Sequence, residues 1–204
     1  MLASRTPNLP KMTPEEFFAW HERQEEKYEL IDGYPVLKFK RDPVTGMAGG
    51  TAAHGLIMLN AGAALRAQLR GKRCRPLPSD VAVKIPSGKH RYPDLSIDCG
   101  PLDRQAQACA EPVLVLEVLS PTTTWKEQNA KLADYQSVPT LRYIVLVEQA
   151  RRYAQIWTRR SSGWTLSEHA APDSRLAFPS LEVELAFDDL YEGVEPEEEG
   201  APPA

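Results

Sequence analysis

Two apolar stretches, each interrupted by one carboxylate, constrain this chain most strongly. Residues 92–98 have the sequence Tyr-Pro-Asp-Leu-Ser-Ile-Asp, and residues 112–121 have the sequence Pro-Val-Leu-Val-Leu-Glu-Val-Leu-Ser-Pro. Both patterns are typical of strands, yet buried strands rarely contain residues such as Asp94 and Glu117. A buried carboxylate is costly unless it is paired, hydrogen-bonded or bound to a cation. Two such strands with a lysine nearby indicate a site for a divalent metal.

The spacing of the two acids allows them to meet. The segment between them is long enough for the two strands to be neighbours in one sheet. Strand alternation places Asp94 on a face with Ser96 and Asp98, and Glu117 on a face with Val115. Facing each other, the acids can chelate Mg²⁺, which takes one or two carboxylates, waters and phosphate oxygens. The alternative is that Asp94 caps a turn and Glu117 pairs with a structural Arg or Lys.

A helix that follows Ser120-Pro121 is expected to supply a third group. A threonine among residues 122–124 can cap this helix, which runs to about residue 136. Glu127, Lys131 and Tyr135 recur every four residues and share one face. Lys131 would orient the attacking water or offset negative charge at a scissile phosphate. The spacing of Glu127 and Lys131 is equally that of a plain surface ion pair.

The composition predicts a single soluble domain. The chain has 204 residues, of which 42% are hydrophobic and 25% charged. We expect a flexible N-terminus at residues 1–12, one domain at residues 13–191, and a disordered Glu- and Pro-rich tail at residues 192–204. No apolar run is long enough to cross a membrane and the N-terminus lacks a signal-peptide pattern, so we expect a cytoplasmic protein.

Charge and cysteine content exclude some classes of protein. The formal net charge of −4 counts against a protein that coats nucleic acid through bulk charge. Basic residues cluster at 66–75, at Lys84, Lys89, His90 and Arg91, and at 151–160, and we expect solvated faces there. Three cysteines without a C-x-x-C pair predict reduced thiols rather than disulfides or a zinc site.

The order of the predicted elements indicates an α/β or α+β fold. A capping box at residues 13–16 starts a helix to about residue 23, and a hairpin follows at 28–31 and 34–39. A Gly-rich loop at 41–50 precedes a helix at 52–69. Further strands are predicted at 74–77, 81–85, 92–98, 113–119, 141–147, 152–158, 164–169 and 181–185, and one helical turn at 187–191. No Gly-rich nucleotide-binding loop occurs in the sequence.

The ordered set of motifs resembles the Uma-type restriction endonuclease family of the PD-(D/E)XK nuclease superfamily. The matching motifs are Tyr-Glu-Leu-Ile-Asp-Gly at 28–33, His54, Ser-Asp-Val-Ala-Val at 79–83, Tyr-Pro-Asp-Leu-Ser-Ile at 92–97, Val-Leu-Glu-Val-Leu-Ser-Pro-Thr-Thr at 115–123, Lys131, Tyr135 and Leu-Arg-Tyr-Ile-Val-Leu-Val at 141–147. Each motif alone is weak, but their common order over residues 13–190 is specific.

The resemblance implies a restriction-endonuclease-like core: a mixed central sheet flanked by helices, with an N-terminal helix and hairpin. It also implies hydrolysis of DNA with Mg²⁺ or Mn²⁺ held by Asp94, Glu117 and the backbone carbonyl of Val118. Superfamily members usually carry a lysine two residues after the second acid, where this chain has Leu119. The family pattern moves that lysine to the following helix, where Lys131 matches it.

The resemblance also gives roles to residues around this core. Glu29 matches an N-terminal acid that is a further ligand or orients a water, against a simple hairpin salt bridge. His54, Asp80, Glu127 and Tyr135 are candidates for substrate contact or for support of the site. Superfamily members often form homodimers that cut two strands, so a homodimer is expected here too.

Two rival functions remain open at this point. The first is a binding or scaffold module that has kept the fold without useful catalysis, which the acidic composition favours. The second is a metal-dependent hydrolase of RNA or of smaller phosphodiesters.

Overall fold

The computed structural model describes residues 10–38, 50–121 and 123–194. Residues 1–9, the Gly-rich loop up to residue 49 and the tail from residue 195 lie outside the described residues. The predictions of a flexible N-terminus, a domain ending at residue 191 and a disordered tail therefore stay predictions.

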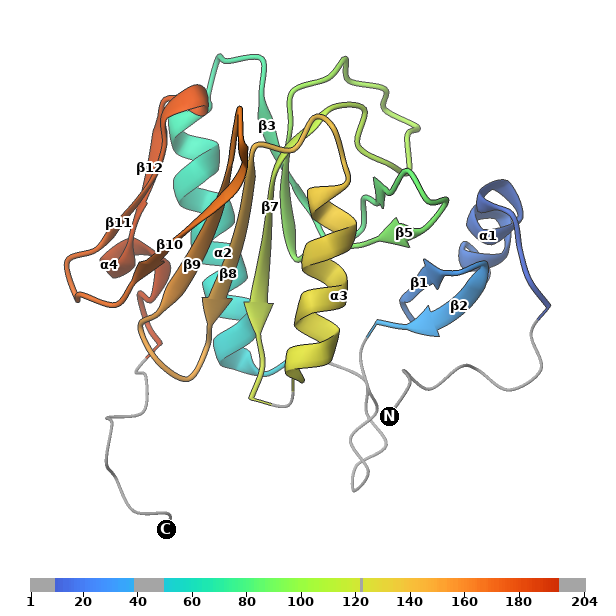
Figure 1. Cartoon of the computed structure of the whole chain (residues 1–204), viewed down its shortest axis with the longest axis horizontal. Helices are drawn as coiled ribbons and strands as arrows, with labels where there is room; N and C mark the ends of the chain where they lie inside the picture. Colours follow the sequence, from blue (N-terminus) through green and yellow to red (C-terminus); the bar gives the residue numbers. More distant parts are fainter. Residues whose placement is uncertain (1–9, 39–49, 122, 195–204) are drawn as a thin grey trace, which may run out of the picture.

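A six-stranded mixed sheet forms the centre of the molecule (Figure 1). Its strand order is β10-β9-β8-β7-β6-β3. The strands are β3 (Arg75–Pro78), β6 (Leu95–Asp98), β7 (Pro112–Leu119), β8 (Tyr143–Glu148), β9 (Ala154–Arg160) and β10 (Gly163–His169). β7 and β8 run parallel through a crossover that contains α3 (Trp125–Gln136), and the other neighbours pair antiparallel. The predicted fold class, with a mixed sheet flanked by helices, is confirmed.

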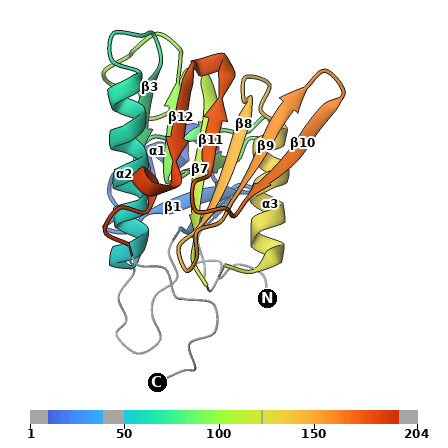
Figure 2. The ribbon, with the colours of Figure 1, turned by 90° about the vertical axis from the view of Figure 1, so that its left-hand side faces the viewer.

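The two long helices cover opposite faces of this sheet (Figure 2). α2 (Ala52–Gln68) packs against one face, where Leu114 and Leu116 of β7 point. α3 covers the other face, where Val115 of β7 joins Tyr135 in a second cluster. Successive side chains of β7 point to opposite faces, and both faces are buried. The strand is therefore apolar along almost its whole length.

Local sequence signals explain where the helices begin. Thr124 caps α3 by accepting a hydrogen bond from the N–H of Glu127, and the Glu127 carboxylate accepts from the N–H of Thr124 in return. Thr51 caps α2 through the N–H of His54. Each cap satisfies backbone donors that the first turn leaves unpaired. Pro139 prevents α3 from continuing.

A second, four-stranded sheet attaches the N-terminal part of the chain to the strand that carries Asp94. α1 (Pro14–His21), capped by Thr13 as expected, packs against β1 (Tyr28–Ile31), which pairs with β2 (Tyr34–Leu37). The turn between them uses positive φ angles of 53° at Asp32 and 83° at Gly33. β1 also pairs with β5 (His90–Arg91), which pairs with β4 (Val83–Lys84).

This small sheet changes two of the predicted strands. The strand expected at 81–85 is formed only over Val83–Lys84. The strand expected at 92–98 is formed only over Leu95–Asp98, as β6 of the central sheet, whereas β5, just before the expected strand, pairs with the N-terminal hairpin. The chain passes from the small sheet to the central sheet at Tyr92-Pro93. Proline has no N–H to donate to a neighbouring strand, so neither sheet includes it.

The C-terminal part of the chain packs beside α2. It contains β11 (Arg175–Phe178), a 3₁₀ turn at Pro179–Leu181, β12 (Val183–Ala186) and α4 (Phe187–Leu190). β11 was not predicted, and the strand expected at 181–185 begins two residues later because the 3₁₀ turn uses Leu181. The apolar residues of this hairpin close the core on the α2 face.

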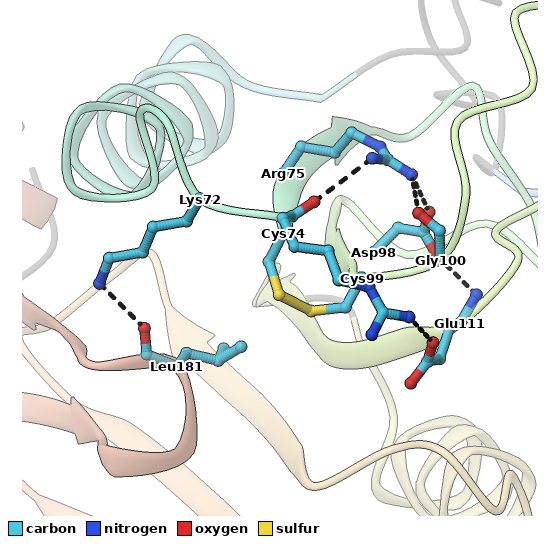
Figure 3. The surroundings of a disulfide bond; sticks show 9 residues. Lys72, Cys74, Arg75, Asp98, Cys99, Gly100, Glu111 and Leu181 are labelled. Carbon is cyan, nitrogen blue, oxygen red and sulfur yellow. Dashed lines mark hydrogen bonds and ion pairs between the residues drawn. A yellow bond between two sulfur atoms is a disulfide. The ribbon is translucent and has the colours of Figure 1, made fainter.

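A disulfide corrects the expectation of reduced thiols. Cys74 and Cys99 are bonded to each other (Figure 3). Cys109 is free and buried. The register of β3 and β6 pairs Arg75 with Asp98, so the residues one step beyond face each other as well. Because two of the three cysteines are bonded, the cysteines no longer indicate a reducing compartment.

Reduction of this disulfide is expected to lower the melting temperature. The bonded residues are 25 apart, and closing a loop of that length stabilises the folded state by about 3 kcal/mol. For a chain of this size that corresponds to a fall in Tm of roughly 5–10 °C. Thermal unfolding followed by circular dichroism, with and without dithiothreitol, measures it. Cys74→Ser should lose the response to dithiothreitol and Cys109→Ser should keep it, and an equal response in both variants would contradict the bridge.

Candidate active site

The two acidic residues of the predicted site lie at facing positions of neighbouring strands. β6 and β7 pair antiparallel with Leu95 opposite Leu116. Continued by one residue, this register brings Asp94 opposite Glu117, and side chains opposite each other lie on the same face. Both residues are buried, with exposed fractions of 2% and 3%. Glu117 lies within β7, whereas Asp94 directly precedes β6, which begins at Leu95.

Asp94 is held by donors from three different elements. The Lys38 ammonium, just after β2, lies 2.9 Å from Oδ1 of Asp94. Nε2 of His54, in the first turn of α2, lies 3.4 Å from Oδ2. The backbone N–H of Val118 donates to the same Oδ2 at 2.9 Å. The carboxylate is thus anchored at the point where the hairpin, α2 and β7 converge.

Glu117 is held by α3. The Lys131 ammonium lies 2.9 Å from Oε2 of Glu117, and the Tyr135 hydroxyl donates to Oε1 at 2.6 Å. Lys131 and Tyr135 are one helical turn apart, so one face of α3 presents both donors to β7. Tyr135 is fully buried, whereas the Lys131 side chain is 26% exposed.

A second ion-pair network adjoins this pair. Arg91 of β5 donates to Glu29 of β1 at 2.6 Å, and its Nε and Nη2 both donate to Asp134 of α3 at 2.9 and 2.6 Å. The N–H of Tyr92 also donates to Glu29. Glu29, Arg91 and Asp134 have exposed fractions of only 4%, 7% and 8%. Arg91 therefore joins the N-terminal sheet to α3.

Mutual charge shifts the pKa values of these groups. Burial alone would lower the pKa of Lys131, but Glu117, Glu29 and Asp94 raise it above its usual value. Burial would raise the pKa of Asp94, but the hydrogen bond with His54 and the charges of Lys38 and Lys131 lower it. At neutral pH the site therefore presents carboxylates and a firmly protonated lysine.

The donor set fits a hard divalent cation. Asp94 and Glu117 each hold a lysine ammonium, which shows that both carboxylates attract a positive charge. The N–H and C=O of one strand residue point to the same side, so the carbonyl of Val118 lies on the side of Asp94 that its N–H contacts. Mg²⁺ commonly takes one or two carboxylates and keeps several waters. In the described part of the chain no set of three or more His, Cys, Asp and Glu residues is arranged to hold a metal, so these two carboxylates and one carbonyl would be the protein's ligands.

Two of the candidate residues lie in other surroundings. Asp80 is exposed and pairs with Lys27 at 2.5 Å. Glu127 accepts from the N–H and hydroxyl of Thr124 and so completes the N-terminal cap of α3. The structure brings together Asp94, Glu117, Val118, Lys131, Tyr135, His54 and, through Lys131 and Arg91, Glu29.

Sequence reasoning missed Lys38 and Arg91, and it gave no role to Asp134. Arg91 and His90 were expected on a solvated basic face, but both are buried. Asp134 shares the helix face of Lys131, so its spacing was a usable signal. The position of Arg91 directly before Tyr-Pro-Asp was another, whereas no local pattern marks Lys38.

Comparisons with known proteins show the family to which the chain belongs. Residues 14–188 match the model of the family Uma2, which is described as "Putative restriction endonuclease". The chain belongs to the Uma2 family. Its relatives include the uncharacterised proteins slr1290 and sll1609 of Synechocystis sp.. They are 31% and 23% identical, and the alignments cover 91% and 84% of this chain and 94% and 95% of the relatives.

A solved structure shows the same fold as this Uma2 chain. It is described as "a putative nuclease belonging to DUF820" from Anabaena variabilis. The TM-score is 0.69 at 16% identity, and the alignment covers 90% of this chain and 99% of that one. In the described part of this Uma2 chain, no helix has the length and apolar character needed to cross a bilayer.

The Glu29–Arg91 pair is expected to make stability depend on pH. Burial would raise the pKa of Glu29, but Lys131, Arg91 and Lys38 lower it below its usual 4.5. Glu29 therefore binds a proton more readily in the unfolded chain than in the folded one. The stability that the ionised Glu29 contributes is present above about pH 4.5 and is lost as the pH falls through its pKa in the folded chain.

Urea denaturation at pH 7, 5 and 3 measures this dependence. Glu29→Gln is expected to lower the free energy of unfolding by about 3 kcal/mol at pH 7, because it leaves a buried cation partly unpaired. The difference from the original chain should shrink toward pH 3. Glu182→Gln, which removes an exposed pair with Lys72, should change stability by less than about 1 kcal/mol. A difference that is independent of pH would contradict the account.

Proposed function

We propose that this Uma2 chain is an endonuclease that hydrolyses phosphodiester bonds of DNA with Mg²⁺ or Mn²⁺. The observation that supports the proposal most is the pair of buried carboxylates, Asp94 and Glu117, at facing positions of β6 and β7 with a lysine beside them. Nucleases with carboxylate sites bind one or two metals through such acids. Asp94, Glu117 and the carbonyl of Val118 would hold the cation.

A bound divalent cation would supply Lewis-acid stabilisation of charge on the phosphate and increase the acidity of an attacking water. The chain's own residues carry the rest. Lys131 stays protonated because three carboxylates surround it, so it acts as a fixed positive charge rather than a base. It would stabilise the negative charge that develops on the phosphoryl oxygens.

His54 and Tyr135 have positioning roles in this proposal. Tyr135 fixes the Glu117 carboxylate from the buried side, which leaves Lys131 free to turn toward substrate. His54 contacts Asp94 and its side chain is 13% exposed, so a phosphate oxygen can reach the ring. A homodimer with two such sites would cut both strands of a duplex.

One observation favours a second candidate function. All four carboxylate oxygens of Asp94 and Glu117 already accept from protein donors. A chain in which Lys38 never leaves Asp94 would be a binding module that has kept the fold without catalysis. Calorimetric titration with Mn²⁺ separates the two, because the binding module takes up no ion.

Cleavage by defined variants tests the proposed function. We expect the purified protein to nick plasmid DNA with Mg²⁺ or Mn²⁺ and to stop with EDTA. Asp94→Asn and Lys131→Ala should each lower the rate about 10²-fold or more, because each removes charge that the transition state needs. Single-stranded DNA and RNA of equal length show which substrate is preferred.

Matched substitutions outside the site control for general damage. Asp173→Asn alters an exposed aspartate between β10 and β11, and Lys126→Ala alters an exposed lysine of α3. Both should cleave within about twofold of the original rate, as expected for surface changes. Cleavage that survives unchanged in Asp94→Asn and Lys131→Ala would falsify the assignment.

A further inference from the structure

α3 presents a second functional face, away from Glu117. Lys131 and Tyr135 contact Glu117 from one side of the helix. Residues at i, i+3, i+4 and i+7 form another side, because that spacing follows one stripe of a helix. This stripe lines a cavity and consists of Trp125, Gln128, Asn129 and Leu132.

The cavity lies between α3 and the ends of the central strands. Its volume is about 310 Å³. The strand residues that line it include Leu119 of β7 and Gln155 and Trp157 of β9. A volume near 300 Å³ is at the lower end of small-molecule sites. The cavity is therefore of a size for one planar ring system rather than for a peptide segment.

The side-chain amides of Gln128 and Gln155 are among the polar groups that line the cavity. Nδ2 of Asn129 and Nε1 of Trp157 have no hydrogen-bond partner in the described part of the chain, but neither atom is accessible to solvent, so neither is available to a ligand there. A side-chain amide offers both a donor and an acceptor to the edge of a planar ligand.

The rim of the cavity is aromatic and carries the ion pair of Arg151 with Glu148. The Trp125 side chain is exposed, with a fraction of 79%, although it borders the cavity. The guanidinium of Arg151 lies 4.4 Å from the ring centre of Tyr153, and both residues line the same cavity. Exposed indole rings commonly take part in recognition, because they offer a large flat apolar surface and one polar edge.

The cavity adjoins the candidate active site. Leu119 is two residues beyond Glu117 on β7, so the two side chains share a face and lie about 7 Å apart along the strand. Leu132 is the neighbour of Lys131 on α3. A strand whose phosphate contacts Lys131 would bring an adjacent base to the cavity.

We propose that this cavity binds one nucleobase of the substrate strand, next to the phosphate that is cut. The inference rests on the proposed nuclease function and adds a specific contact to it. A nucleobase has a flat face for the indole of Trp125, and its edge carries ring nitrogens, carbonyl oxygens and amino groups. The side-chain amides of Gln128 and Gln155 offer donors and acceptors to that edge.

Binding of a strand with and without bases tests this site. The probes are a fluorescent oligothymidylate and a strand of equal length made only of abasic nucleotides, so that both carry the same phosphates. Anisotropy titrations in EDTA give both dissociation constants without cleavage. The protein should prefer the strand with bases at least about fivefold, since one stacked base contributes roughly five- to a hundredfold.

Three variants and one control make the result specific. Trp125→Ala should reduce the preference for bases to less than about twofold, and Trp125→Phe should keep most of it, because phenylalanine retains a stacking face. Gln128→Ala should weaken only the strand with bases, because it removes an amide that lines the cavity. Leu59→Ala, which changes a 65% exposed apolar residue of α2, should leave both constants unchanged.

The outcomes separate this site from the nuclease function. Equal binding of both strands by the original protein overturns the nucleobase site, as does a preference that Trp125→Ala and Gln128→Ala leave intact. If the protein gives either of these results and still cleaves DNA, the nuclease function stands and the nucleobase site is rejected. If the protein prefers the strand with bases through Trp125 but cleaves no substrate, the nucleobase site stands and the nuclease function is rejected.

Discussion

The charge balance of Asp94 and Glu117 underlies the rest of the structure. Antiparallel pairing of β6 and β7 sets these acids opposite each other in a buried position, where two carboxylates without positive partners would repel strongly. Lysines from two other elements supply the compensation: Lys38 on Asp94 and Lys131 on Glu117. Such an arrangement is costly to maintain for stability alone, since apolar residues of similar volume usually serve a core at least as well. In the proposed nuclease, the two acids would present this negative charge to a cation.

The site also explains why the chain needs its small N-terminal sheet. β1 and β5 place Glu29 and Arg91 against α3, where Arg91 is shared with Asp134. The end of the β2 strand brings Lys38 to Asp94. The N-terminal hairpin, α2, α3 and the central sheet thus meet at one set of ion pairs. A cation that replaced Lys38 at Asp94 would therefore alter a contact that ties the hairpin to the sheet.

Much of this arrangement could be predicted from the sequence, because the decisive signals are local. β7 is an apolar run with one acid, and α3 follows a Ser-Pro boundary with a threonine cap, so their positions and the approach of Lys131 were foreseeable. Pairing between segments that lie far apart in the sequence could not be predicted. The two-residue strands β4 and β5 are too short to leave a pattern, so the burial of Arg91 stayed hidden. The Cys74–Cys99 bridge likewise depends on the register of β3 and β6, which no local motif encodes.

The most direct measurement of the central claim is a crystal structure of the protein soaked with Mn²⁺, with the ion located by its anomalous scattering. The account predicts one strong peak within bonding distance of Asp94, Glu117 and the carbonyl oxygen of Val118, with the Lys38 ammonium displaced from Asp94. A peak bound elsewhere, or no peak while Lys38 and Lys131 keep their carboxylates, would contradict it.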